Sequence, residues 1–553
     1  MNIYLDYQNR IFKLIKQLAK KKEINIPLNL NNKSFAVEHP PKNQKAHISC
    51  NAAMVLAKIN KKSPLELAEI LKKNLILNFK EFELIEIAGP GFINIYLKKS
   101  FWKKYLTNII TLDGKYGSLN NPKKKYNIEF VSANPTGPLH VGHCRGAIIG
   151  DTLSNLLKFN GNKVVKEYYV NDHGGQIKNF TSSVYFRILE IIDKKSFPDN
   201  KDLYPGSYII DIAKKIINKK SIKDFSNYKK INKKLTSESI KCSMELIKNN
   251  LILLGVKHDK FVYESKIISK NNVSEVIKKL VKKNYIFKGK LTPPKGEKTK
   301  NWKSRNQLLF KSTIFGDDTD RPLQKANGEW TYFAGDMAYH ANKISRKFNF
   351  LINILGADHA GYIKRITSAA KAISNEKVNL ICKVSQLVKL YQDGQPFKMS
   401  KRKGDYITVE DLIREVGKDS TRFMMLNRSN DAELDFDFKQ VSEKSKDNPI
   451  FYVQYAFARI NSIFRTLKLN IKNKIIIDDD FTPNDFELEI IKKISEWPKC
   501  VEVSTNKLEP HRIPYYIYEL ATLSHSYWSM GRDNKEYRII NESQHPHQYI
   551  LEY

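Results

Sequence analysis

The stretch from residue 130 to 161, FVSANPTGPLHVGHCRGAIIGDTLSNLLKFNG, constrains the fold more than any other part of the chain. A short apolar run ending at Val131 is typical of a buried strand, and the proline and glycine residues of 134–138 end it. Apolar residues then recur at helical spacing over 148–157, and Asn160-Gly161 ends that pattern. The stretch therefore predicts a strand, a tight loop and a helix.

Two further apolar runs indicate a parallel sheet. KVVKEYYVND (163–172) predicts a second strand, which completes a strand–helix–strand unit within roughly 45 residues. FNFLINILGADH (348–359) predicts a buried parallel strand with polar groups at its end. Ligands bind at the carboxyl ends of such strands. The predicted fold is α/β with a Rossmann-like parallel sheet, and the absence of GxGxxG gives no support to dinucleotide binding.

His140 and His143 lie one turn apart at the start of the predicted helix. Free backbone N–H groups and the helix dipole favour an anion there. Gly142 leaves room for a phosphate or a flat group to approach the backbone. The alternative is a pair of surface histidines, since four-residue patterns recur by chance.

A glycine-rich basic loop, DGQPFKMSKRKGD (393–405), follows far down the chain. Taken alone it is a solvated charged loop. Taken with the two histidines, Lys398 and Lys401 complete a clamp that could hold a triphosphate.

Composition limits the class of protein. The formal net charge of +36 favours a polyanionic partner such as RNA, although lysine is abundant throughout the chain and part of the excess is compositional drift. No run approaches ~20 apolar residues, and the N-terminus lacks the pattern of a signal peptide. The five cysteines are far apart, so neither a zinc site nor disulfides are expected. We expect a cytoplasmic protein without membrane contacts.

The two ends of the chain predict different domains. A helix over about 6–22, a capping box at 63–66 and two strands within 82–97 predict an α+β N-terminal module. Helical periodicity from Asn448-Pro449 onwards, then over 484–505 and 512–530, predicts an all-α C-terminal domain.

The chain resembles a known family. HVGH and KMSKR are similar to the signature pair of class I aminoacyl-tRNA synthetases, and the surrounding text resembles arginyl-tRNA synthetases. The matching segments, which run in order along nearly the whole chain, are EFVSANPTGPLHVGH (129–143), EYYVND (167–172), WTYFAGD (330–336), GADHAGYIKR (356–365), KMSKRKGDYITVEDL (398–412), LDFDF (434–438) and DNPIFYVQYAFARI (447–460).

The resemblance implies three domains. These are an N-terminal tRNA-contact domain over residues 1–115, a catalytic Rossmann-like domain over 116–445 with a helical insertion at about 180–300, and an anticodon-binding domain over 446–553. The family has a further helix near the C-terminus, whereas here His545-Pro546-His547 breaks any helix. The C-terminal end therefore departs from the family pattern, and we expect a packing element of the anticodon-binding domain to be missing or replaced there.

It also implies an activity, in which arginine and ATP give arginyl-adenylate and the arginyl group passes to tRNA(Arg). The expected substrates and partners are ATP with Mg²⁺, L-arginine and tRNA(Arg), without zinc or any other protein-held metal, and the expected state is a monomer. The expected catalytic residues are His140, His143, Lys398 and Lys401. The expected ATP-binding residues are Gly137, Pro138, His140, Gly142, His143, Lys398, Met399, Ser400 and Lys401.

By the same resemblance, Glu129 and Asn134 hold the α-amino end of arginine, and Ser132 is a further arginine-binding residue. Tyr332 and Asp336 hold the guanidinium side, and four-residue spacing places them on one helix face. Asp336 could instead cap that helix. His359 supplies a further polar contact.

Tyr452, Tyr455 and Arg459 are the expected tRNA-binding residues, because aromatic rings and guanidinium planes stack on bases. For Tyr452, and for the neighbouring Phe457, packing within a helical core is an equally good interpretation. Two rival functions stay open: a nucleotidyltransferase that adenylates a small acid without RNA, and a catalytically silent tRNA-binding paralogue.

Overall fold

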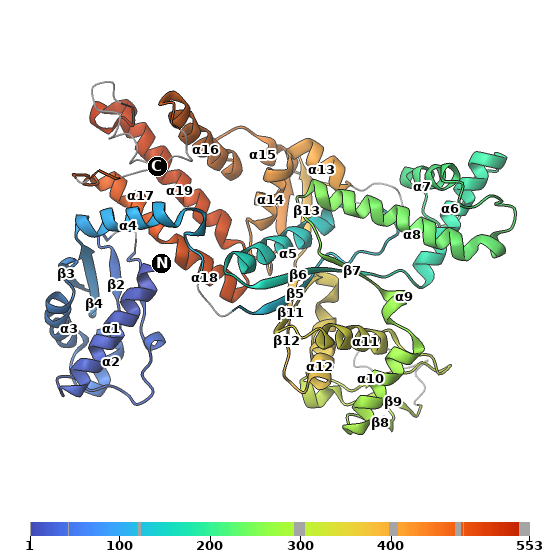
Figure 1. The fold of residues 1–553 in the computed structure, drawn as a ribbon, viewed down its shortest axis with the longest axis horizontal. Coiled ribbons are helices and arrows are strands. Elements are labelled where there is room, and N and C mark those ends of the chain that lie inside the picture. The colour runs from blue at the N-terminus through green and yellow to red at the C-terminus, as the bar shows by residue number, and fades with distance from the viewer. Residues whose placement is uncertain are drawn as a thin grey trace. The chain divides into compact units, whose positions relative to one another are not determined.

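The computed structural model describes residues 2–41, 44–119, 123–291, 305–397, 407–469, 477–478 and 480–540 (Figure 1). The chain forms two compact units. The first joins residues 1–120 to 445–508 and 512–553, and the second holds 121–444 with 509–511.

A five-stranded sheet organises the second unit. Its order is β12-β11-β5-β6-β7, and every neighbouring pair is parallel. The strands are β5 (Lys125–Glu129), β6 (Lys163–Val170), β7 (Lys260–Tyr263), β11 (Phe350–Gly356) and β12 (Asn379–Ser385). The parallel sheet expected from the sequence is confirmed. After β5 the chain adds β6 and β7 on one side of this strand, and it later adds β11 and β12 on the other side. The strand order therefore reverses between β5 and β11, and ligands of such folds bind at this reversal.

Side chains alternate between the two faces of this sheet, and each face has its own helix (Figure 1). Phe130 faces α5 (Val141–Phe159) so closely that a Cβ atom at Gly150 would lie 2.3 Å from the phenylalanine ring. Glu129 and Glu167 stand side by side on the opposite face, where they bond to α11 (Tyr332–Ser345). α12 (Ile363–Ser374) packs beside α11.

Two smaller substructures are inserted in this unit. The helices α6 (Gly175–Asp193), α7 (Ser207–Asn218) and α8 (Tyr228–Leu253) enclose an apolar core of their own. A second group consists of α9 (Glu264–Ile267), α10 (Lys270–Lys282) and a sheet of β8 (Ile286–Gly289), β9 (Gln307–Phe310) and β10 (Arg321–Pro322). The range of about 180–300 is therefore not purely helical, since β7 within it completes the parallel sheet.

The unit ends in a second small sheet and short helices. β13 (Val388–Gln392) pairs with β14 (Gln395–Phe397) and β15 (Leu434–Asp437). Thr408 and Asp411 form the expected capping box of α13 (Val409–Val416), which ends at Gly417. α14 (Lys418–Leu426) and α15 (Phe438–Ser442) follow.

The N-terminal part of the first unit is α+β, as expected. Its antiparallel sheet has the order β1-β2-β4-β3. The elements are α1 (Ile3–Lys20), β1 (Val37–Glu38), β2 (Ile48–Cys50), α2 (Ala52–Asn60), α3 (Pro64–Asn78), β3 (Phe82–Ala88), β4 (Phe92–Leu97) and α4 (Lys99–Leu112). Ser63 and Glu66 form the capping box that begins α3.

The C-terminal part of this unit is helical. Its helices are α16 (Pro449–Thr466), α17 (Asp485–Ser495), α18 (Trp497–Lys507) and α19 (Arg512–Asp533). The single helix expected over 484–505 is two helices, with Pro498 in the first turn of the second. The expectation for the chain end after residue 540 lies outside the described residues.

The two parts of the first unit share one core. Ile477 and Ile491 belong to the apolar cluster of the N-terminal module. The Trp497 indole N–H donates to the carbonyl of Tyr116 at 3.1 Å, and the Tyr116 hydroxyl donates to the carbonyl of Ile494 at 2.9 Å. The N-terminal module is thus attached to the helical domain by buried contacts.

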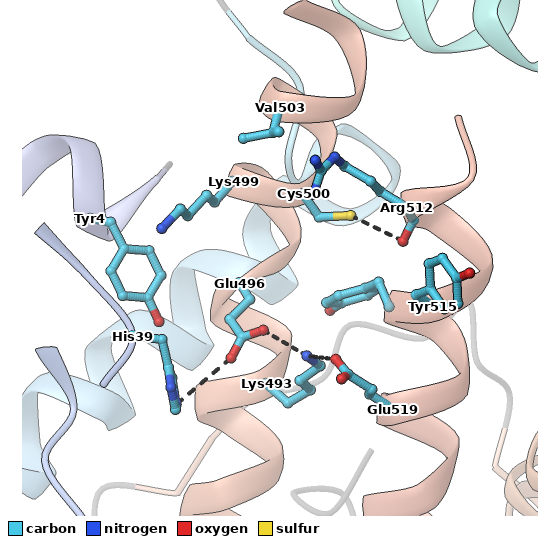
Figure 2. A pocket seen from close by; sticks show the side chains of 11 residues that line it. Tyr4, His39, Lys493, Glu496, Lys499, Cys500, Val503, Arg512, Tyr515 and Glu519 are labelled. Carbon is cyan, nitrogen blue, oxygen red and sulfur yellow. Dashed lines mark hydrogen bonds and ion pairs between the residues drawn. The ribbon is translucent and has the colours of Figure 1, made fainter. Parts of the chain in front are cut away.

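A cavity of about 300 Å³ lies at this junction, lined by residues of α1, the β1 end, α17, α18 and α19 (Figure 2). Lys493 pairs with both Glu496 and Glu519, and His39 lies 3.7 Å from Glu496. Lys499 lies over the ring of Tyr4 at 5.0 Å. Lys499 Nζ also lies 3.7 Å from Glu38 Oε2 of the N-terminal part, which adds an ion pair to the shared core.

We predict that Gly117→Ala loosens this junction. Gly117 has φ +89, and a Cβ atom there would lie 2.5 Å from Trp497 Cδ1. Backbone strain and the clash together should cost about 2 kcal/mol of stability. The measurement is the thermal unfolding midpoint. Gly114→Ala is the control, because a Cβ atom at Gly114 meets nothing within 4 Å. Equal midpoints for the two variants would contradict the prediction.

Candidate active site

The two histidines are built into the start of α5. His140 is the N-cap residue, and its Nδ1 accepts from the backbone N–H of Gly142 at 3.2 Å. His143 Nδ1 accepts from the N–H of His140 at 3.3 Å, and the two rings lie 4.0 Å apart. Because both Nδ1 atoms accept, the neutral rings carry their proton on Nε2. Two Nε2–H donors therefore accompany the helix N-terminus, which suits a phosphate.

The loop between β5 and α5 has a strained backbone. Val131 and Ser132 have φ values of 70° and 42°, in the left-handed region that non-glycine residues rarely adopt. Two bonds hold this conformation. The Tyr169 N–H donates to Ser132 Oγ at 3.0 Å, and the Tyr168 hydroxyl donates to the carbonyl of Ala133 at 2.8 Å. Consecutive strained residues directly after a central strand are typical of a functional site.

Backbone pairing brings the end of the basic loop to this helix start. The Val141 N–H donates to the carbonyl of Ile407 at 3.1 Å, and the Val409 N–H donates to the carbonyl of Leu139 at 3.0 Å. Ile407 follows directly on the KMSKRKGDY segment. Lys398, Met399, Ser400 and Lys401 lie outside the described residues, so the clamp itself stays a prediction, but the described end of their loop lies beside His140.

Carboxylates gather at the ends of three strands and on α11. Asp336 accepts a hydrogen bond from the Tyr362 hydroxyl, and burial raises the pKa of Asp336 to about 6. Burial, with the charges of Asp336 and Asp172, raises the pKa of Glu264 to about 7. Negative charges this close favour a bound cation. A planar guanidinium can satisfy several carboxylate oxygens at once.

The helix cap leaves Asp336 available for that task. Thr331 is the N-cap of α11, and its side chain accepts from the N–H of Ala334. The alternative interpretation of Asp336 as the cap is therefore wrong.

Glu129 and its neighbours border the same edge of the sheet. Glu129 accepts from Ser132 Oγ at 3.1 Å and from Lys343 Nζ. The Asn134 side chain is exposed and donates to Gln176 Oε1 at 2.6 Å. Polar side chains that the sequence places after β5 thus surround the strained turn.

Tyr332 and His359 are more open. Tyr332 is 79% exposed, and Lys325 Nζ lies 5.6 Å from its ring centre. His359 follows β11 and lies 3.4 Å from Asp358. Their assignment to arginine stays a prediction.

Gly137 and Pro138 lie in the loop before α5. A Cβ atom at Gly137 would lie 2.9 Å from the ring of Tyr208, so a residue other than glycine fits here only if that ring is displaced. The role of both residues toward ATP stays a prediction.

The three expected tRNA-binding residues share one side of α16. Arg459 lies 4.2 Å from the ring centre of Tyr455 and donates to its hydroxyl at 3.0 Å. Tyr452 packs against His525, with ring centres 4.2 Å apart. Phe457 is 70% exposed, so packing within a helical core is wrong for this residue.

Sequence analysis missed several residues of the site. Glu264 directly follows β7. Recognising KFVY as a strand would have placed Glu264 with the other polar residues at the carboxyl ends of the strands. Tyr339, Lys343 and Arg346, which bond to Glu129 and Glu167, carry no sequence signal that separates them from other residues of a helix.

Among the described residues, no three His, Cys, Asp or Glu side chains gather as a metal site would require. The helices of the described part are all too short or too polar to cross a membrane.

Three family models match successive parts of the chain. Residues 6–97 match the arginyl tRNA synthetase N-terminal domain. Residues 105–461 match the catalytic domain of class I tRNA synthetases of the arginine type, and residues 453–548 match the DALR anticodon-binding domain. The fold is thus that of a class I aminoacyl-tRNA synthetase. The chain belongs to the arginyl-tRNA synthetase family.

Curated proteins similar to this chain belong to the same family. The chain is 56% identical over 545 residues to the arginine–tRNA ligase of Pelagibacter ubique, covering 98% of this chain and 94% of that protein. It is 43% identical to the arginine–tRNA ligase of Wolbachia pipientis wMel, with the same coverage. The solved Thermus thermophilus arginyl-tRNA synthetase matches at 18% identity with a TM-score of 0.68, covering 98% of this chain and 95% of that chain, and shows the same fold.

We predict that Asp336→Asn lowers the pKa of Glu264. The substitution removes one nearby negative charge, while burial, the main cause of the raised pKa, remains. The measurement is a pH titration of ¹³C-labelled glutamate carboxyls by NMR, with Glu264→Gln to assign the signal. Asp318→Asn, which removes an exposed partner of Lys364, should leave the titration unchanged. A pKa of Glu264 that stays near 7 in Asp336→Asn would show that the two carboxylates do not interact.

Proposed function

We propose that the chain is an arginine–tRNA ligase and that the site described above carries its chemistry. The enzyme activates L-arginine with ATP to arginyl-adenylate and pyrophosphate, and then transfers the arginyl group to the 3′ end of tRNA(Arg) for translation. The observation that carries the assignment of the site is the pairing of 139–141 with 407–409, which joins the HVGH helix start to the end of the KMSKR loop.

Activation requires positive charge and N–H donors more than acid–base groups. A carboxylate oxygen of arginine attacks the α-phosphorus of ATP, the bond from that phosphorus to the bridging oxygen breaks, and pyrophosphate leaves. Negative charge grows on the phosphate oxygens in the transition state. The Nε2–H groups of His140 and His143 and the N-terminus of α5 suit the phosphates near the reacting phosphorus. Lys398 and Lys401 suit the β- and γ-phosphates.

Arginine would lie between two groups of polar side chains. Asp336 and Glu264 suit the guanidinium, since both are partly buried and close to each other. Glu129, Ser132 and Asn134 suit the α-amino end, because Glu129 ends β5 and the other two follow it on the same edge of the sheet. Tyr332 and His359 complete the proposed contacts at the open side.

Transfer requires the tRNA 3′ end to reach the adenylate. A ribose hydroxyl of the terminal nucleotide attacks the arginyl carbonyl, the bond to the phosphate breaks, and AMP leaves. Tyr452, Tyr455 and Arg459 of α16, of which Tyr455 is 44% exposed, would contact bases of the same tRNA.

The remaining parts of the proposal are a monomeric state, a cytoplasmic location and Mg²⁺ that enters with ATP. The metal would neutralise phosphate charge and act with the protein's cations rather than through protein ligands.

The test of function is arginine-dependent exchange of labelled pyrophosphate into ATP, with and without tRNA(Arg). Exchange in either condition, together with arginylation of tRNA(Arg), supports the ligase. Absence of exchange in both, with tRNA still bound, would instead indicate a catalytically silent tRNA-binding protein. Exchange with arginine but no arginylation would indicate adenylation without RNA transfer.

We predict that Lys401→Ala lowers the activation rate by roughly 10²–10³-fold, because contacts made mainly in the transition state are lost. Arginine binding, measured by calorimetry, should stay nearly unchanged. Lys389→Ala on β13 is the control, since this lysine pairs with Glu433 at the surface. An unchanged rate in Lys401→Ala would exclude the clamp.

We also predict that Asp336→Asn weakens arginine binding about tenfold or more while ATP binding changes little, because an amide cannot balance the guanidinium charge. Dissociation constants for each ligand are the readout, with Asp318→Asn as the exposed control. Equal weakening of both ligands would assign Asp336 to the framework of the site rather than to arginine.

A further inference from the structure

A line of buried polar groups runs beneath the proposed arginine pocket. It starts on α11, passes through β11 and ends at β5. His340 and Asn353 are each 4% exposed, and Lys343 is 0% exposed. Burying a charged lysine is costly unless it is paired and hydrogen-bonded. Packing of α11 alone therefore does not explain why these polar groups are buried.

The direction of each bond follows from the chemistry of its atoms. His340 Nδ1 lies 2.9 Å from the carbonyl oxygen of Asp336, which only accepts, so Nδ1 carries the proton. Burial lowers the pKa of His340 to about 4, so the ring is neutral near pH 7. Its Nε2 then accepts, and Asn353 Nδ2 donates to it at 3.2 Å.

The line continues to Lys343, which donates in both directions. Lys343 Nζ donates to Asn353 Oδ1 at 3.0 Å and also to Glu129 Oε2. Ser132 Oγ donates to the other carboxylate oxygen of Glu129 at 3.1 Å. Each side chain from His340 to Ser132 thus bonds to the next, and every donor faces an acceptor.

A different pair of residues already anchors α11 to the sheet. Arg346 bonds to both carboxylate oxygens of Glu167, and the Tyr339 hydroxyl lies 2.9 Å from Glu167 and 3.1 Å from Glu129. The line through His340 differs because it joins the backbone of Asp336 to the carboxylate of Glu129. Those residues are the proposed contacts for the two opposite ends of arginine.

We propose that His340, Asn353 and Lys343 are positioning residues that fix the separation between Asp336 and Glu129 and so select an amino acid of arginine's length. This inference rests on the proposed function. None of the three needs to touch the substrate. A shift of one carboxylate relative to the other would spoil the simultaneous fit of the guanidinium and the α-amino group.

The first test is Asn353→Leu, which removes both bonds of Asn353 while keeping a side chain of similar size. The KM for arginine in tRNA arginylation should rise about tenfold while the KM for ATP stays within about twofold. The preference for arginine over homoarginine, whose side chain has one more methylene, should fall by a similar factor. Asn342→Leu, on the same helix but half-exposed, should change neither value.

Parallel increases in the KM for arginine and the KM for ATP would overturn the proposal, because general distortion of the site would explain them. An unchanged preference over homoarginine would also overturn it. A wild-type protein without arginine-dependent exchange would overturn the proposed function instead, so the two failures can be distinguished.

A second pair of variants covers the case in which Asn353→Leu does not fold. His340→Asn keeps a donor near the position of Nδ1, whereas His340→Leu removes every bond of the ring. Direct calorimetric binding should show an affinity for arginine closer to wild type in His340→Asn than in His340→Leu. Equal losses in the two variants would overturn the proposal.

Discussion

Two buried carboxylates in register on adjacent strands constrain much of the catalytic unit. Glu129 of β5 and Glu167 of β6 stand side by side on one face of the parallel sheet. Two negative charges at this depth would be strongly unfavourable without cations and donors. α11 supplies them through Tyr339, Lys343 and Arg346. Since the same helix carries Asp336, neutralising the sheet also determines where that carboxylate lies.

The opposite face of the sheet and its carboxyl edge complete the site. Phe130 packs tightly against Gly150 of α5, which sets the helix directly behind the strained turn. The short backbone pairing between 139–141 and 407–409 then joins two segments more than 250 residues apart in sequence. Histidine N–H donors at the start of α5 and the carboxylates of Asp336 and Glu264 thus border the same edge, an arrangement that suits the proposed reaction between ATP and arginine.

In the first unit, apolar packing and hydrogen bonds join segments that are distant in sequence. Its N-terminal module and its helices share an apolar core and exchange backbone–side-chain hydrogen bonds around Tyr116 and Trp497. The two segments are separated by the whole catalytic unit in sequence, yet they form one compact body. A tRNA that contacts both would therefore meet surfaces held in a fixed mutual arrangement.

The sequence alone determined the elements and their chemistry. Apolar periodicity and turn residues predicted the parallel sheet and a helix that begins near His140 or His143, because these depend on local spacing, whereas the role of Asp336 came only from the resemblance to a known family. Tertiary structure alone decided which distant groups meet. Glu264 entered the site because β7 joins the sheet, and the histidine–asparagine–lysine line beneath it exists only because α11, β11 and β5 pack together. Thr331, rather than Asp336, caps α11 because the helix begins one turn earlier than Asp336, and only the backbone geometry shows where a helix begins. Long-range packing of side chains has no periodic signature, so no reading of spacing could have supplied these contacts.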